Sequence, residues 1–361
     1  MHPLDQRTLV SFVHGYQNLD ITLGNGPRPA LWSVQGDVRV AHSYPFPRAP
    51  EDFAELGDVI RGTQPGAEQP SFKRLPRFGL TGLSVAGDRV YAGSWNGVYV
   101  INRDDLSLEG IISHEMMSDM HGIWAEEDHV VTVLTPRDTV VITDLDGNVV
   151  EHFRVHSDLS ITTDSGAEGV DWRFVGKQFR GSTGYWHFNY VQRIDGELWL
   201  TSRNANCFVV VDPVKRTARL KLMNLCTPAL LHDGRKVGSR FFFTSIDGKV
   251  IIASPHLDQH HTHQELDRVE APGVYLRDMV SKLIRLEETS LGREPNWCRG
   301  IAVADEVIQV TIDGRYDTDL SFGLLAINEQ GEVLRNARYR WEEAGDPTEL
   351  RYVTGFDVEV A

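Results

Sequence analysis

Cysteine is scarce in this 361-residue sequence, and long apolar runs are absent. The three cysteines are widely spaced, with no pair separated by two residues: Cys207, Cys226 and Cys298. This pattern excludes a disulfide framework or a cysteine-rich zinc module and fits reduced thiols. No stretch approaches the roughly 20 apolar residues of a membrane-spanning helix, and the first residues lack a secretory signal pattern. We therefore expect a cytoplasmic protein that does not insert into a membrane.

Basic residues are outnumbered by acidic ones. Lys and Arg total 36 against 51 Asp and Glu, which gives a formal net charge of -15. A chain with this balance repels the phosphate backbone of nucleic acids and the anionic surface of membranes. Neither nucleic acid nor a membrane is therefore expected as a partner.

Three common catalytic and nucleotide-binding motifs are missing. The sequence contains no GxSxG nucleophile elbow, no GxxxxGK[ST] phosphate loop and no GxGxxG dinucleotide fingerprint. Each motif places a nucleophile or a phosphate at the turn between a strand and a helix. Their absence disfavours a serine hydrolase, an NTPase and a dinucleotide-dependent enzyme.

The sequence does contain a weak repeat. Two segments share one order of strand and turn signals and begin at Thr81 and His121: TGLSVAGDRVYAGSWNGVYVIN and HGIWAEEDHVVTVLTPRDTVVITDLDGN. Each alternates short apolar strands with acidic or glycine turns, at the spacing of roughly 40 to 50 residues typical of propeller blades. Each segment therefore predicts one four-stranded blade.

Further copies begin at His187, Pro228 and Arg299, and strand patterns near both chain ends, 30–46 and 351–361, complete the series. Pairing the terminal strands in one shared blade would close the ring and remove open sheet edges.

We predict a single all-β domain over residues 1–361, a β-propeller of six four-stranded blades, with five or seven blades as alternatives. A short helix is expected at 50–61. Three insertions are expected between strands, at about 47–77, 156–186 and 255–297. Long excursions from a rigid scaffold often carry specificity.

Three segments resemble parts of known propellers: DMHGIWAEEDHVVTV from Asp119, WHFNYVQRIDGELWLTS from Trp186 and CRGIAVADEVIQVT from Cys298. They resemble the innermost strands of six-bladed β-propellers of the NHL, gluconolactonase and strictosidine-synthase type. The resemblance implies the fold and no particular reaction, because propellers host many unrelated functions.

Gluconolactonase-like propellers hold a divalent metal ion at the channel mouth through carboxylates and an asparagine. The resemblance places Asn189 at the position of that asparagine. The carboxylate expected before the strand glycine is replaced by His121 in HGI and by Arg299 in RGI. The resemblance therefore does not carry the whole metal site over to this chain.

The aligned repeats predict which side chains converge, because the first residues of innermost strands face the central channel of a propeller. These residues are Thr81, His121, His187, Asn189, His232 and Arg299. Neutral imidazole binds divalent metal ions and titrates near neutral pH. We therefore predict that His121 and His187 are catalytic acid-base residues or ligands of a divalent metal ion. The alternative is a structural channel in which the imidazoles bond only to backbone and water.

The remaining candidates concern the substrate. Arg299 is expected to hold an anionic group or a developing oxyanion, and Asn189 to orient the substrate or complete a ligand set. The preceding insertion adds Glu168, Arg180 and Trp186 as substrate-binding residues, with charged groups beside an aromatic wall. The expected substrate is a small molecule with anionic or zwitterionic character.

A second cluster of histidines lies in PHLDQHHTHQE, residues 255–265. It holds His256, His260, His261 and His263 but lacks the HExxH spacing of a zinc protease. The segment is either a solvated loop or a lid that supplies one ligand.

Two functions follow from these residues. The first is a small-molecule enzyme, a lyase, isomerase or hydrolase, with a histidine-centred site at one mouth of the channel and a divalent metal ion as an optional cofactor. The second is a non-catalytic propeller that binds a ligand or a protein.

Overall fold

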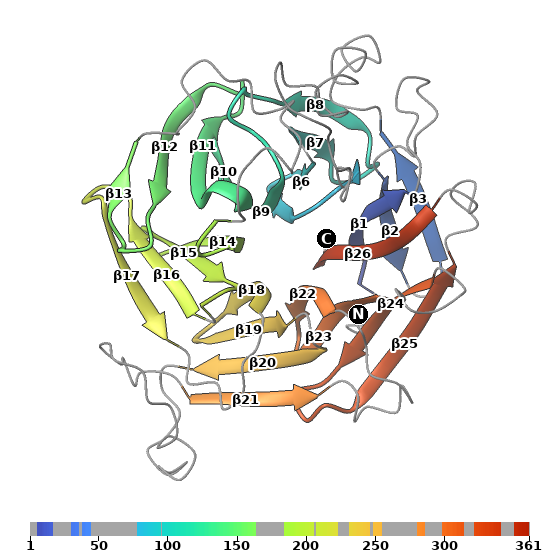
Figure 1. Cartoon of the computed structure of the whole chain (residues 1–361). Coiled ribbons are helices and arrows are strands. Elements are labelled where there is room, and N and C mark those ends of the chain that lie inside the picture. The colour runs from blue at the N-terminus through green and yellow to red at the C-terminus, as the bar shows by residue number, and fades with distance from the viewer. Residues whose placement is uncertain are drawn as a thin grey trace, which may run out of the picture.

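A ring of six antiparallel sheets forms the fold (Figure 1). The computed structural model describes residues 6–16, 30–35, 38–44, 78–94, 96–163, 184–205, 207–222, 231–245, 248–254, 280–285, 298–313, 321–340 and 350–360. Within these residues each sheet has four or five strands. The six-bladed, all-β propeller predicted from the sequence is confirmed.

Five blades are built from consecutive strands, with the innermost strand first. Blade 1 contains β5 (Leu83–Ala86), β6 (Arg89–Gly93), β7 (Val98–Asn102) and β8 (Leu108–Ile112). Blade 2 contains β9 (Met120–Ala125), β10 (His129–Leu134), β11 (Thr139–Asp144), β12 (Val149–Val155) and β13 (Ile161–Thr162). Blade 3 contains β14 (Phe188–Ile194), β15 (Glu197–Ser202), β16 (Cys207–Asp212) and β17 (Thr217–Leu222).

Blades 4 and 5 follow the same plan. Blade 4 contains β18 (Leu231–Val237), β19 (Arg240–Ser245), β20 (Lys249–Ser254) and β21 (Val280–Arg285). Blade 5 contains β22 (Cys298–Ala304), β23 (Val307–Asp313), β24 (Ser321–Ile327) and β25 (Val333–Arg340). The strand β21 lies within residues 255–297, so part of that expected insertion supplies the outer strand of blade 4.

Blade 6 closes the ring with both ends of the chain. Its innermost strand, β26 (Leu350–Val360), pairs antiparallel with β1 (Thr8–Tyr16). The strands β2 (Ala30–Gln35) and β3 (Val38–Ser43) follow, and β4 (Phe78–Gly79) also pairs with β1. This pairing confirms the shared terminal blade, which leaves no gap in the ring of innermost strands.

Some expectations fall on residues outside the described ranges. These are the helix at 50–61 and the histidine cluster at 255–265. Helical structure in the described part is limited to one 3-10 turn, η3 (Thr135–Arg137). None of the described segments forms a helix that is long and apolar enough to cross a bilayer.

Apolar side chains fill the spaces between the blades. Every residue of β10 except the first is buried, because neighbouring blades cover both faces of this strand. Side chains of β10 and β11 meet Val191, Leu198 and Leu200 of blade 3 in one core. Burial of one such valine or leucine contributes about 1.5–3 kcal/mol. The summed burial between blades is the main force that holds the ring together.

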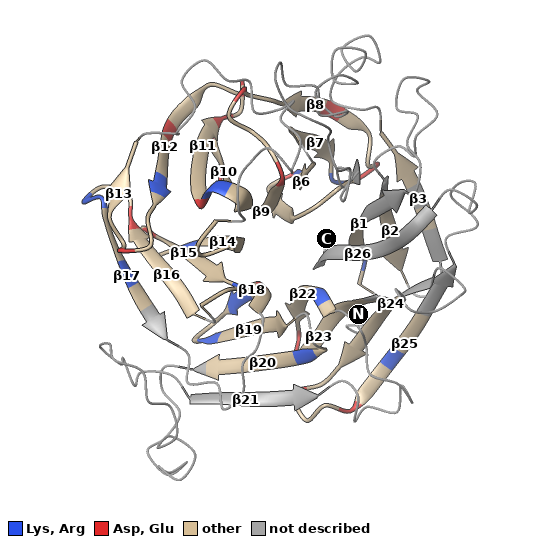
Figure 2. Cartoon of the chain, viewed as in Figure 1, with Lys and Arg blue, Asp and Glu red and all other residues tan. Residues whose placement is uncertain are grey.

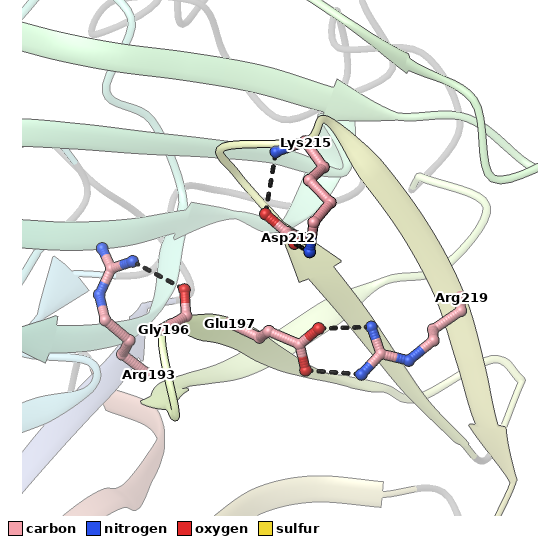
Figure 3. A network of polar contacts seen from close by, with 6 residues as sticks. All are labelled: Arg193, Gly196, Glu197, Asp212, Lys215 and Arg219. Carbon is pink, nitrogen blue, oxygen red and sulfur yellow. Dashed lines mark hydrogen bonds and ion pairs between the residues drawn. The ribbon is translucent and has the colours of Figure 1, made fainter.

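Ion pairs lie on the outside of blade 3 (Figure 3). The Arg219 guanidinium donates to both carboxylate oxygens of Glu197, at 2.6 and 2.5 Å, and Lys215 donates to Asp212 at 2.7 Å. Exposed pairs of this kind contribute only about 0–1 kcal/mol each, because water and salt screen them. Their substitution is therefore suited to control experiments on the channel.

Glycines allow the innermost strands to approach one another. A Cβ atom on Gly82 would lie 2.6 Å from the backbone oxygen of His121, and one on Gly122 would lie 2.8 Å from the Cα of Tyr190. Backbone atoms cannot move aside as a flexible side chain can, so only glycine fits at these two positions. The glycine shared by the TGL and HGI repeats is therefore a packing requirement of the ring.

A β-bulge interrupts the innermost strand in blades 2 to 6. The register shifts occur at His121, at Asn189, at His232–Asp233, at Arg299–Gly300 and at Phe356–Asp357. A bulge adds one residue to one strand of a pair and redirects its side chain away from the regular alternation. Four residues predicted for the site, His121, Asn189, His232 and Arg299, thus occupy equivalent irregular positions.

Buried hydroxyl groups connect neighbouring blades close to these bulges. The Thr244 hydroxyl accepts from Asp233 N and donates to the backbone oxygen of Arg299. Three similar bonds run from Thr201 to His232 O at 2.9 Å, from Thr135 to Phe188 O at 2.6 Å and from Ser11 to Thr81 O at 2.9 Å. Each bond contributes about 0.5–1.5 kcal/mol and fixes the backbone of a channel residue.

The substitution Gly122→Ala tests the close approach of β9 and β14. We expect a loss of about 1–3 kcal/mol in the free energy of unfolding, because the new methyl group meets the backbone of β14. Gly110→Ala is the matched control, since a Cβ atom there would meet nothing within 4 Å. Urea unfolding measures both, and equal stability of the two variants would contradict the packing requirement.

Candidate functional site

Three buried imidazoles from three blades lie together near the axis of the ring. The His121 ring centroid is 5.9 Å from that of His187 and 6.1 Å from that of His232. His121 lies on β9, His187 directly precedes β14, and His232 lies on β18. The structure thus brings together three histidines that are far apart in the sequence, and their chemical roles remain predictions.

Asn189 sets the orientation of His121. The Asn189 Nδ2 group donates to Leu231 O at 3.4 Å, which leaves its Oδ1 atom directed at His121 Nδ1, 2.9 Å away. An amide oxygen can only accept, so this network assigns the proton to Nδ1 of the neutral imidazole. The Nε2 atom of His121 then carries the lone pair and lies 3.7 Å from Asp119 Oδ1.

A tight turn holds His187. Its backbone adopts a left-handed conformation with a φ of 54°, which is unusual for a residue with a side chain. The Asp138 carboxylate accepts from the backbone N–H groups of Trp186 at 3.0 Å and His187 at 2.9 Å. Arg203 Nη1 lies 3.4 Å from His187 Nε2, so the guanidinium donates to the imidazole. Backbone and side chain of His187 are therefore both fixed.

Burial of Asp138 raises the pKa of its carboxyl group from 3.8 to about 6. The backbone bonds from Trp186 and His187 act in the opposite direction, because they stabilise the ionised form. Gly184 makes room for this carboxylate, since a Cβ atom there would lie 2.3 Å from it. The turn that carries His187 is therefore held by a carboxyl group whose ionisation is disfavoured by burial.

His232 is a neutral imidazole at neutral pH. Complete burial lowers its pKa well below 6.5, and the nearby Arg299, His121, His187 and Arg203 lower it further. Its backbone oxygen is held by Thr201 of blade 3. The imidazole can therefore donate one hydrogen bond and accept another without carrying charge.

Arg299 enters the same cluster from blade 5. It lies at the bulge of β22 with 3% of its surface exposed, and Thr244 holds its backbone oxygen. A guanidinium group keeps its charge at any pH at which proteins fold. The site therefore contains a permanent positive charge close to His232.

Arg235 crosses the channel. It belongs to β18 of blade 4, and its Nη2 atom donates at 3.4 Å to Leu83 O on β5 of blade 1. These strands lie on opposite sides of the ring (Figure 1). The guanidinium carbon also lies 5.0 Å from the centre of the Tyr190 ring of blade 3, a cation-π contact. Arg235 thus spans the centre of the propeller further along β18 than His232.

The structure differs from the expected substrate wall. Trp186 is buried in the core between blades 2 and 3, stacks on Phe188 at 6.4 Å and donates from its indole nitrogen to His156 O. This position indicates that Trp186 packs in the core and supports the His187 turn. It does not indicate contact with a substrate. Glu168 and Arg180 lie outside the described residues.

Three residues at the site were missed by sequence reasoning: Asp138, Arg203 and Arg235. Asp119 was considered only as part of a possible ligand set with His114 and His121. Arg235 had a detectable signal, since an arginine directly after the glycine of an innermost strand replaces the apolar residue found in TGL, HGI and RGI. Asp138 and Arg203 lie in turns between strands, and no local pattern connects them to His187.

A divalent metal ion fits these residues poorly. His187 Nε2 accepts from the Arg203 guanidinium, so this nitrogen has no lone pair left for a metal ion, although His121 Nε2 keeps one. The charges of Arg203 and Arg299 would repel a cation placed among the imidazoles. Across the described ranges, no group of three His, Cys, Asp or Glu side chains is arranged to hold a metal ion.

The substitution Asp138→Asn tests the buried carboxyl group. The pKa of the Asp138 carboxyl group is about 6 in the folded state and 3.8 in an unperturbed carboxyl group. The folded state therefore holds this proton more tightly than the unfolded state, so the wild type loses stability as the pH rises from 4 through 6. Between pH 4 and 7, we expect the free energy of unfolding of the wild type to fall by up to about 3 kcal/mol relative to that of the variant. Urea unfolding at several pH values measures this trend.

The control is Asp144→Asn, which removes an exposed carboxylate whose pKa is lowered by the side chain of Asn148. Its effect on the pH dependence should have the opposite sign. A stability difference for Asp138→Asn that stays constant with pH would refute the raised pKa.

Comparisons with known proteins identify no family. No family model matches the chain, and no curated protein sequence matches it. Three similar solved structures are those of a streptogramin B lyase, a putative 6-phosphogluconolactonase from Bacteroides uniformis ATCC 8492 and the β-propeller domain of Cps50 (Swd1) from Myceliophteria thermophila.

The lyase is 10% identical, with a TM-score of 0.43 over 92% of this chain and 87% of that one. The lactonase is 12% identical, with a TM-score of 0.46 over 92% and 82%, and the Cps50 domain is 10% identical, with 0.41 over 72% and 85%. Similarity at this level assigns no activity.

Proposed function

We propose that this protein is a small-molecule enzyme in which His121 transfers a proton at one mouth of the propeller channel. The observation that carries the proposal is the Leu231–Asn189–His121 chain of hydrogen bonds, which directs the basic Nε2 atom of one imidazole. A catalytic base needs a fixed tautomer and orientation, and a buried amide whose own position is fixed supplies both.

The surrounding groups complete an acid-base site. When His121 Nε2 takes up a proton, the Asp119 carboxylate 3.7 Å away stabilises the imidazolium ion. His187 is a second imidazole near His121, and because Arg203 donates to its Nε2 atom, its proton lies on Nδ1 and it serves as the partner acid. Arg299 stabilises negative charge that develops on the substrate.

Covalent catalysis by cysteine does not fit the described thiols. Cys298 precedes Arg299 but is fully buried, and burial raises the pKa of the Cys207 thiol to about 12. A reactive cysteine needs an accessible thiolate. The proposed chemistry is therefore proton transfer, as in a lyase, an isomerase or a hydrolase that activates water.

The experiment is hydrogen exchange in deuterated water, because an enzyme that abstracts a carbon-bound proton, as a lyase or an isomerase does, labels its substrate even without net turnover. Hydrolysis is followed in the same samples as turnover. The protein is incubated with a panel of small carboxylates and phosphate esters, and NMR detects loss of a carbon-bound proton. We expect His121→Gln to lower the exchange rate by about 10²–10⁴-fold. His129→Gln is the control, since His129 is the first residue of β10 and its Nδ1 atom lies 2.6 Å from Asp128 Oδ1.

Full exchange activity in His121→Gln would refute the role of this residue. Binding of a panel member with neither exchange nor turnover would favour the other function expected from the sequence, a propeller that binds ligands without catalysis.

Metal binding by His121 and His187 remains a prediction from the sequence. The donor set described above leads us to expect metal well below one ion per chain in protein purified without a His-tag. His121→Ala and His187→Ala should leave this content unchanged. A near-stoichiometric ion that is lost in both variants would contradict the expectation and indicate metal-assisted chemistry.

A further inference from the structure

We infer that the substrate of this site carries an oxyanion group, a carboxylate or a phosphate, which binds between Arg203 and Arg299 above a channel floor formed by Arg235. This inference rests on the proposed function and names the class of molecule on which His121 acts. Arg203 and Arg235 were not among the residues predicted from the sequence.

The first argument is the balance of charge at the axis. Arg203 follows β15, Arg235 lies on β18 and Arg299 lies on β22, so three blades each contribute one guanidinium group. The buried acidic side chains described near them are Asp119, Asp138 and Asp233. Asp138 accepts hydrogen bonds from the backbone of the His187 turn, so Asp119 and Asp233 are the carboxylates that remain to balance three guanidinium groups. The side chains around the neutral imidazoles are therefore more basic than acidic.

The position of this charge is the second argument. The protein as a whole carries a formal charge of -15, so a positive centre runs against its composition. Basic residues are visible on β18 and β22 next to the axis (Figure 2). A structural channel would be filled by apolar side chains at lower cost, because a buried charge must be desolvated.

The lowered pKa of His232 depends in part on the same positive charges. Burial is the largest cause of its lowered pKa, and the next four are its neighbours Arg299, His121, His187 and Arg203, all of which disfavour a further positive charge. The charges of Arg299 and Arg203, unlike burial, would favour an anion in the same place.

The chemistry of arginine limits the class of ligand that this site would bind. A guanidinium group donates two parallel hydrogen bonds to a carboxylate or phosphate, and such pairs are stronger than neutral hydrogen bonds. Arg203 is already in contact with His187, and Arg299 lies at the bulge of β22 that is equivalent to the bulge of His232 on β18. An oxyanion bound by these two arginines would therefore lie beside the imidazoles that transfer the proton.

Arg235 limits the size of this molecule. Its bond to Leu83 O on the opposite side of the ring places a side chain across the centre of the propeller. Because Tyr190 lies under the same guanidinium, this barrier has contacts with three blades. The ligand must then enter and leave by the mouth at which the bulges lie, and it cannot thread through the channel.

The test uses inorganic phosphate and acetate as probes, with binding followed by NMR of the histidine ring protons. We expect one probe to bind the wild type in the millimolar range and to shift the His232 signals. Arg299→Met and Arg203→Met should each weaken binding at least tenfold, and Arg299→Lys should restore part of it, because the charge returns without the paired donors. Circular dichroism checks that each variant is folded.

Arg219→Met is the matched control, because Arg219 pairs with Glu197 on the outside of blade 3. Phosphate binding without acetate binding assigns a phosphorylated substrate, and the reverse assigns a carboxylate. Equal affinity in the wild type, both arginine variants and the control would show adventitious binding and overturn the inference.

The variant His121→Gln separates this inference from the proposed function. It should lose deuterium exchange while it keeps the affinity for the probe. If the wild type binds neither probe but still exchanges substrate protons through His121, the oxyanion site is wrong and proton transfer stands. If the probe binds and no exchange occurs with any panel member, the anion site stands and the catalytic proposal fails.

Discussion

The close approach of the innermost strands around one axis is the constraint on which this structure depends. Where β5, β9 and β14 meet, even one extra carbon atom on Gly82 or Gly122 would overlap neighbouring backbone. Regular strands cannot converge in this way without leaving backbone groups unpaired, and bulges with buried hydroxyl groups resolve the conflict. The side chains released from regular pairing at those bulges include His121, Asn189 and Arg299. The candidate site is thus a product of the same geometry that closes the ring.

Electrostatics gives this site its character. Asn189 directs His121, Asp138 anchors the backbone of His187, and burial together with the arginines keeps His232 neutral. These groups lie where little water can screen them, so each charge acts more strongly on its neighbours than it would at the surface. The pairs on the outside of blade 3 have ordinary hydrogen bond lengths and much less influence.

The sequence predicted the fold and the convergence of the histidines because both follow from the repeat. Strand alternation with a turn between strands identifies blades, and aligned blades place equivalent residues at the axis. The repeat could not reveal Asp138, which acts through the backbone of a residue 49 positions away, or Arg235, whose partner Leu83 lies in a different blade. Trp186 was assigned to the substrate because it adjoins His187, yet the left-handed turn directs it into the core. Contacts between distant blades are set by three-dimensional packing, which local pattern does not encode.

The shared terminal blade has a consequence for how the protein reaches this state. The strand β1 lacks its inner neighbour until β26 is available, and these two strands lie at opposite ends of the described chain. During synthesis, five blades can assemble while blade 6 waits with an unpaired edge, which is open to association with other chains. Pairing of such distant segments also carries a large loop-closure cost, which slows folding. Ring closure is therefore the step at which we expect this chain to be most exposed to misfolding and most dependent on chaperones.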